Sequence, residues 1–172
     1  LWELPDAVRT VCIEDTPELP VAALQSAGRD VQALRAGGEG GELTPAEALR
    51  TALRLGDGAL VVGEVRGEEA GVLYEAMRVG ANSEAVLGTI HGDGAAAVYE
   101  RVVSDLGVAP SAFGVTDLVV TCEIAADGTR RVGTVEEVVG GYSPSFVTLF
   151  ERTGDGLAPT GHLARGNSRL PA

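Results

Sequence analysis

The chain has 172 residues, of which 45% are apolar, so it is long enough to form a folded domain with a sizeable core and is not a disordered tail. Its formal net charge of -12 argues against a broad electrostatic grip on nucleic acid or on an anionic membrane. All 13 basic residues are Arg, and the lack of Lys excludes a G-x-x-x-x-G-K-[ST] phosphate-binding loop and Schiff-base chemistry within these residues.

Two explanations of this acidic composition without Lys stay open. One is a very salty cytoplasm, where dissolved ions screen the repulsion between the chain's negative charges, and the other is a GC-rich genome. No apolar run approaches the roughly 18 to 20 residues of a membrane span, and the start of the chain does not resemble a signal peptide. We therefore expect a cytoplasmic protein without a membrane span. The chain begins without Met, in an apolar segment at residues 1–4, so we expect it to be a piece of a longer polypeptide.

The first half of the chain alternates short apolar runs with helical patterns. Residues 9–14 predict a buried strand that ends in a polar run, whereas residues 21–41 are Gly-rich and stay ambiguous between strand and helix. The run Thr44-Pro45-Ala46-Glu47 predicts a helix start with a hydroxyl N-cap. Residues 59–62 are continuously apolar, which indicates a central strand covered on both faces.

The second half continues this alternation and then changes. Helices are expected over 68–79 and 95–106, with a strand over 85–90 between them. The strand and helix order predicts an α/β fold with a mainly parallel sheet, flanked by helices, whose functional groups lie at the carboxyl ends of the strands. After Pro110, residues 117–124 and 129–139 predict a C-terminal β-hairpin that turns at Asp127-Gly128.

The remaining assignments concern the chain's end and its thiols. Residues 142–150 can add one more element, so the folded domain is expected to cover 1–150 and a flexible tail 151–172. Cys12 and Cys122 each lie in a Val/Ile/Thr-rich run. Because such runs predict buried strands, we expect two buried free thiols in preference to a disulfide or a metal site.

Polar side chains follow the predicted strands where each strand ends: Glu14, Asp15 and Glu18 after the first, Glu64 and Arg66 after 59–62, and Thr89, His91 and Asp93 near the end of 85–90. Carboxylates, a histidine and an arginine on one edge can hold a divalent cation and a phosphate chain. Structural interpretations stay open beside this one. The first two carboxylates can cap the next turn, Glu64 can pair with Arg66, and His91 can be a structural histidine.

Three of these segments resemble sequence boxes of one known family. Residues 13–18 (IEDTPE) resemble its acidic box, residues 60–69 (LVVGEVRGEE) its Walker B segment, and residues 88–93 (GTIHGD) its histidine box. In this order and spacing, over about residues 8–140, the chain resembles the type II/type IV secretion superfamily of motor ATPases, which drive pili, archaella and protein export. Its composition fits a halophilic archaeal member.

The resemblance implies a partial RecA-like P-loop NTPase core that hydrolyses ATP with Mg²⁺. It also implies a hexameric ring of identical subunits that engages a membrane platform protein and couples hydrolysis to protein export or filament assembly. In the family the P-loop precedes the acidic box, so this chain would begin just after it, without the N-terminal domain, and would hydrolyse ATP barely as an isolated piece. Gly92 and Gly94 stand where family members more often carry Ala and a hydroxyl residue.

The acidic residues take their expected roles from the resemblance. Glu64 is implied to be the Walker B carboxylate that holds Mg²⁺ directly or through water, and Asp15 to support the metal shell. Glu14 and Glu18 are implied to polarise or position the attacking water. Phosphoryl transfer asks a protein mainly for such positioning and charge stabilisation.

The resemblance also implies contacts to the nucleotide. His91 is implied to sense the γ-phosphate, Arg66 to stabilise charge or to tie its strand to a neighbour, and Thr89 and Asp93 to complete the nucleotide contacts. Arg29 and Arg35 are candidates for contacts across a subunit interface, with solvated surface arginines as the alternative. Two other functions stay open, namely a non-catalytic assembly module of the same ring and a small divalent-metal hydrolase built on Glu14, Asp15, Glu64, His91 and Asp93.

Overall fold

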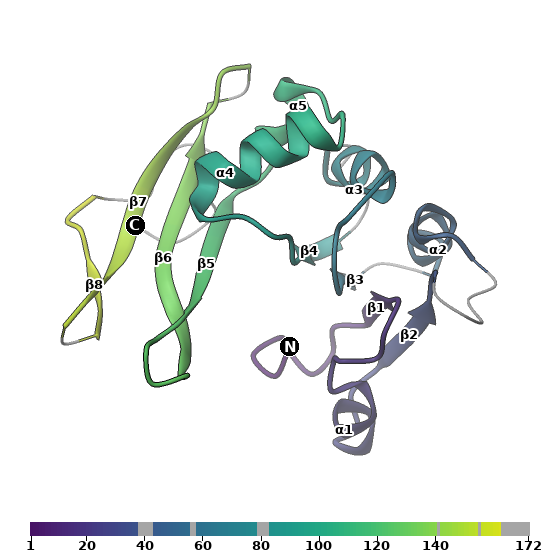
Figure 1. The fold of residues 1–172 in the computed structure, drawn as a ribbon. Helices are drawn as coiled ribbons and strands as arrows, with labels where there is room; N and C mark the ends of the chain where they lie inside the picture. The colour runs from purple at the N-terminus through teal and green to yellow at the C-terminus, as the bar shows by residue number, and fades with distance from the viewer. Residues whose placement is uncertain (38–42, 56–57, 79–82, 141, 155, 163–172) are drawn as a thin grey trace. The chain divides into compact units, whose positions relative to one another are not determined.

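A computed structural model of the chain describes residues 1–37, 43–55, 58–78, 83–140, 142–154 and 156–162. The chain forms two compact units, Leu1–Ile90 and His91–Ala172. Figure 1 shows their elements in chain order. Among the described residues, no helix is both long enough and apolar enough to cross a lipid bilayer.

The first unit is built on a parallel sheet, as predicted. Its strands are β1 (Thr10–Glu14), β2 (Val31–Arg35), β3 (Gly58–Val62) and β4 (Ser83–Gly88), in the order β2-β1-β3-β4. Its helices are α1 (Val21–Ser26), α2 (Pro45–Ala52) and α3 (Glu69–Arg78). The ambiguous segment thus contains both a helix and a strand, α1 and β2, and its residues 38–41 lie outside the described part of the chain.

Apolar side chains cover both faces of the central strands. On one face Cys12 of β1 is fully buried and joins Leu24 of α1 and Val61 of β3 in a core cluster. On the other face the next residue along β1, Ile13, lines a cavity together with Leu49 of α2. Successive residues of a strand point to opposite faces, so the continuous apolar runs of β1 and β3 fill two layers.

Helix α2 begins as the sequence predicted. The Thr44 hydroxyl accepts a hydrogen bond from the Glu47 N–H at 3.2 Å, and the Glu47 carboxylate accepts one from the Thr44 N–H at 2.9 Å. The hydrogen bonds that the Glu47 carboxylate accepts from the Thr44 N–H and from the Thr44 hydroxyl lower the pKa of Glu47. The reciprocal pair satisfies N–H groups that the helix itself cannot, with Pro45 at the first turn.

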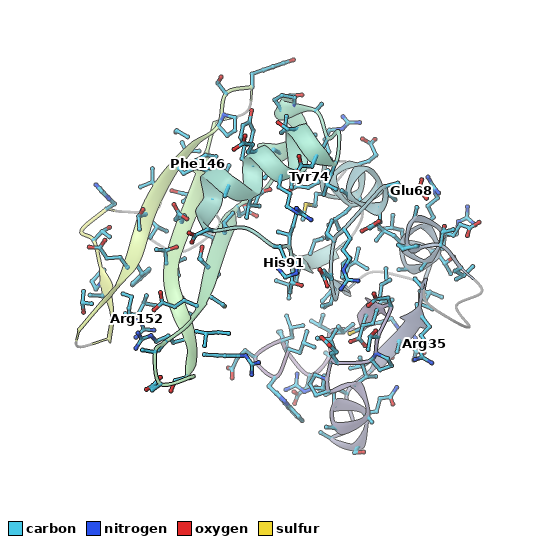
Figure 2. All side chains as sticks on the ribbon, in the orientation of Figure 1. Arg35, Glu68, Tyr74, His91, Phe146 and Arg152 are labelled. Atoms are coloured by element: carbon cyan, nitrogen blue, oxygen red, sulfur yellow. The ribbon has the colours of Figure 1, made fainter. Side chains whose placement is uncertain are left out.

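The second unit contains α4 (Gly94–Glu100), a π-helical turn (Arg101–Asp105), α5 (Pro110–Phe113) and an antiparallel sheet. The helix predicted over 95–106 therefore forms, with a π-helical end. Tyr99 at the end of α4 packs against Phe113, with ring centroids 5.1 Å apart. The ring centre of Phe113 in turn lies 6.3 Å from that of Phe146 on the sheet, which Figure 2 labels, so the three rings join helices and sheet.

The predicted C-terminal hairpin over 117–124 and 129–139 forms, and it is half of a four-stranded sheet. The strands β5 (Leu118–Ile124), β6 (Arg130–Val139), β7 (Ser145–Thr153) and β8 (Gly156–Pro159) follow one another in sheet order. Strand β7 passes the expected boundary at residue 150, and β8 lies in the expected tail. Pairing of β8 with β7 gives this weakly patterned segment its order. Residues 163–172 of that tail lie outside the described part.

The expectation of two buried thiols is correct for Cys12 and wrong for Cys122, which is exposed. Cys122 lies on β5 two residues from Val120 and from Ile124, whose side chains are 51% and 69% exposed. Residues two apart on a strand share a face. A β-branched run also suits a strand with one uncovered face, so its composition did not distinguish the two cases.

This contrast predicts selective labelling of the two cysteines. Burial, followed by the nearby Glu14 carboxylate, raises the pKa of Cys12 from 9.0 to about 11, so that thiol stays protonated and covered at pH 8. We expect iodoacetamide to modify Cys122 in the native protein and to modify Cys12 only after denaturation. Peptide mass spectrometry after alkylation measures this, and equal labelling of both in the native state would contradict the burial of Cys12.

Candidate functional site

A cavity of about 310 Å³ lies at the carboxyl ends of β1 and β3. Its apolar wall comes from strand ends and from α2, through Ile13, Ala36, Pro45, Leu49 and Val62. Its polar wall comes from the carboxyl end of β1, the residue after it, and the loop and helix start that follow β3, namely Glu14, Asp15, Glu64, Arg66, Gly67, Glu68 and Glu69. Ligands of parallel α/β sheets bind at this edge.

The parallel register of β1 and β3 brings these polar residues together. Ile13 pairs with Val62, and the Gly63 N–H donates to the Ile13 carbonyl at 2.8 Å. A Cβ added to Gly63 would lie 3.1 Å from Cγ of Glu14 and 3.2 Å from the Ile13 carbonyl oxygen. Glycine at this position therefore lets the end of β3 approach the Glu14 side chain closely. The predicted meeting of these two strand ends is confirmed.

The Glu14 carboxylate supports the turn that follows β1. Its side chain is buried, and its Oε1 atom accepts hydrogen bonds from the backbone N–H groups of Glu18 at 2.8 Å and Leu19 at 2.7 Å. This geometry is the turn-capping interpretation that the sequence left open. The Glu18 side chain is exposed on the same turn and is not part of the cavity wall.

Arg66 joins the two strand ends through its guanidinium. It forms an ion pair with Asp15 at 3.0 Å and a second ion pair with Glu64. These carboxylates, Glu64 foremost, raise the pKa of Arg66. The Glu64 side chain is 21% exposed, so it lies well inside the wall while Arg66 reaches solvent. Glu64 is therefore both an ion-pair partner of Arg66, as one of the open interpretations had it, and a residue of the cavity wall.

Sequence reasoning missed Glu69 as a member of this site. Its side chain is buried, and its Oε1 atom accepts hydrogen bonds from the backbone N–H groups of Arg66 at 2.6 Å and Gly67 at 2.9 Å. The carboxylate thus shapes the loop that presents Arg66 to the cavity. An acidic residue in the first turn of a predicted helix, two positions after a glycine, was the available signal.

Thr89 extends the sheet beyond β4. Its hydroxyl donates to the Gly63 carbonyl, and its carbonyl accepts a hydrogen bond from the Val65 N–H at 2.8 Å. The Thr89 N–H donates to the Val62 carbonyl at 3.3 Å. The structure therefore places Thr89 against the backbone at the end of β3, next to the residue that precedes Glu64.

His91 and Asp93 belong to the second unit, whereas the other predicted site residues lie in the first. His91 is exposed in the segment that leads into α4, where Figure 2 labels it. Asp93 occupies the N-cap position of α4, but its side chain makes no capping hydrogen bond. The geometry of the cavity is thus defined by residues of the first unit alone.

The two candidate interface arginines differ in their surroundings. The Arg29 guanidinium pairs with Asp6 at 2.9 Å, donates to the backbone carbonyls of Trp2 and Leu4, and lies 5.8 Å from the Trp2 ring centre. Arg29 is therefore not a solvated surface side chain, because it holds the segment before β1. Arg35 is exposed at the end of β2 (Figure 2). A contact of either residue with another subunit stays a prediction.

Comparison with known proteins places this chain in a family. The model of the family described as "Type II/IV secretion system protein" matches residues 4–126, which is most of the chain. The chain belongs to this family. It is 37% identical over 105 residues to the uncharacterized protein MJ1287 of Methanocaldococcus jannaschii, covering 58% of this chain and 35% of that protein.

Solved structures of secretion ATPases share the fold. The VirB11 ATPase of the Brucella suis type IV secretion system is 22% identical, with a TM-score of 0.62 over 79% of this chain and 42% of that one. The Legionella pneumophila ATPase DotB is 17% identical, with a TM-score of 0.53 over 73% of this chain and 35% of that one. This chain therefore spans less than half the length of these three proteins, and at these identities the solved structures show the fold alone.

Proposed function

We propose that the chain is part of an ATP-hydrolysing motor of a type II or type IV secretion or filament-assembly system, and that its cavity is the nucleotide side of a partial RecA-like core. The observation that supports this most directly is the cluster of Asp15, Arg66 and Glu64 on a cavity at the carboxyl edge of a parallel sheet. Membership of the secretion family and the fold shared with VirB11 and DotB support the same proposal.

The residues present fit a magnesium ion that arrives with a nucleotide. Within the described ranges, no three His, Cys, Asp or Glu side chains gather as a complete ligand set. Mg²⁺ is usually held by one or two carboxylates together with phosphate oxygens and waters, and Asp15 and Glu64 can supply those carboxylates. When bound, the ion would neutralise charge on the β- and γ-phosphates.

The chain's own residues would mainly position groups for the reaction. Arg66 holds the carboxylates of Asp15 and Glu64 in one cluster, and Glu69 fixes the backbone from which Arg66 extends. Glu14 holds the turn that carries Glu18, and we assign both carboxylates to the attacking water. Such pre-organised charge is the main source of catalysis in phosphoryl transfer.

Contacts outside this cavity belong to the same proposal. We assign His91 to the γ-phosphate, and Thr89 and Asp93 to further contacts with the nucleotide. The 172 residues of this chain contain no Lys, so the proposal requires that a P-loop come from another part of the full-length protein. A hexameric ring, a membrane platform protein as partner, a cytoplasmic location and a halophilic archaeal source complete the proposal.

Phosphate release from ATP by the full-length protein tests this function. We expect turnover that requires Mg²⁺ and stops with EDTA, and calorimetric binding of the ion that is strong only when a nucleotide is present. An oligomeric ring that neither binds nor hydrolyses ATP would favour a non-catalytic assembly module. Tight metal binding without nucleotide, together with hydrolysis of a simple phosphate ester, would favour a metal hydrolase.

A further inference from the structure

The first turn of α4 is held by a carboxylate from a distant strand. The backbone N–H of Ala95 donates to Oε2 of Glu136, which lies 41 residues further along the chain on β6, at 2.8 Å. Ala95 is fully buried, so its N–H needs a partner within the protein. A carboxylate at a helix N-terminus also compensates the positive end of the helix dipole.

The segment between His91 and this bond has little freedom. Gly94 adopts a positive φ of 84°, and a Cβ there would lie 3.3 Å from the Glu136 carboxylate. A Cβ on Gly92 would lie only 2.7 Å from Cγ2 of Val98, on the inner side of α4. Both glycines therefore let the backbone lie close against the helix and the carboxylate.

Glu136 is itself well anchored. It pairs with Val119 of β5 and, beside a register shift between β6 and β7, with Thr148 of β7, so it has a neighbouring strand on each side. The Thr134 hydroxyl lies 3.5 Å from the same carboxylate oxygen. An inner strand with neighbours on both sides is a rigid base, so it fixes where α4 begins and with it the segment that carries His91.

We propose that Glu136 is a positioning residue for His91, acting through the Ala95 N–H rather than by touching the nucleotide. This inference rests on the proposed function, in which His91 contacts the γ-phosphate. It also explains the start of α4: the usual capping position holds Asp93, which makes no side-chain cap, and the sheet supplies the cap instead.

The test uses three substitutions in the full-length protein. Glu136→Ala removes the carboxylate that accepts the hydrogen bond of the Ala95 N–H, and Glu136→Asp shortens the side chain that carries it by one methylene. Both variants are expected to lower kcat by about tenfold to a hundredfold. KM for ATP is expected to stay within about twofold, because binding of the rest of the nucleotide is not affected. Glu136→Gln keeps an acceptor oxygen and is expected to retain most of kcat. Glu151→Gln, an exposed carboxylate on β7, is the matched control.

Two further measurements separate positioning from general destabilisation. In a His91→Ala background, Glu136→Ala is expected to cause no additional loss of kcat, since its effect passes through His91. Hydrogen exchange of the Ala95 amide is expected to become faster in Glu136→Ala and in Glu136→Asp, with β7 amides unchanged. Should Glu136→Ala fail to fold, the Asp variant carries the same test.

The outcomes also separate this inference from the proposed function. Normal kcat for Glu136→Asp, or additive losses when His91→Ala is combined with Glu136→Ala, would overturn the positioning role while leaving the motor proposal intact. Normal turnover by His91→Ala would overturn the assignment of His91 itself, and the positioning inference with it. A loss of kcat with unchanged KM in Glu136→Asp, retention of most of kcat in Glu136→Gln, and no additional loss when Glu136→Ala is combined with His91→Ala would support it.

Discussion

Glu64→Gln in the full-length protein is expected to lower ATP turnover by a factor of about 10² to 10³ while nucleotide binding stays largely intact. The substitution keeps the size of the side chain and an oxygen that can accept the hydrogen bond of Arg66. It removes the negative charge at the place where the proposed metal ion would be held. Phosphate release and binding of a non-hydrolysable ATP analogue, measured on the same preparation, check both parts.

A matched control is available on the neighbouring helix. Glu75 is an exposed carboxylate on α3 that forms an ion pair with Arg78 at 2.7 Å, away from the cavity wall. Glu75→Gln changes charge by the same amount and is expected to leave turnover unchanged. Wild-type turnover by Glu64→Gln would remove Glu64 from the catalytic residues, and loss of turnover by both variants would point to net charge instead.

Glu64 was predictable because its context is local. A carboxylate two positions after the last residue of a continuous apolar strand lies at the edge of the sheet, and neighbouring parallel strands bring their ends to one edge. The same reasoning predicted that Glu64 and Asp15 meet. Arg66 was expected either to stabilise charge or to connect its strand to a neighbouring one. Its ion pairs with Asp15, after β1, and with Glu64, after β3, connect the ends of these two strands.

Residues that act through long-range backbone contacts were not predictable in this way. Glu136 caps a helix that precedes it by 41 positions, and nothing near Glu136 in the sequence indicates the start of α4. Strand β8 was not predicted for the same reason, because it forms by pairing with β7 and its own four residues carry no strand pattern. Glu69 lies between these cases, since its position at a helix start was visible but its burial was not.

The buried Glu14 gives the second large effect, and it acts on stability. Its Oε1 atom accepts two backbone hydrogen bonds, and bonds to a charged group each contribute about 1.5 to 3 kcal/mol. Glu14→Ala leaves both N–H groups without this acceptor and is expected to lower the free energy of unfolding by about 3 kcal/mol or more. Urea denaturation of the full-length protein measures the loss.

Glu14→Gln separates the support of the turn from a role in catalysis. The amide keeps an acceptor oxygen for the N–H groups of Glu18 and Leu19, so most of the stability is expected to remain. The carboxylate charge is removed, so a fall in turnover without a fall in stability would support the assignment of Glu14 to the attacking water. Unchanged turnover would leave Glu14 as the support of the turn alone, with the water assigned to Glu18. Glu18→Ala is the matched control for stability, since its exposed side chain is expected to contribute less than about 0.5 kcal/mol.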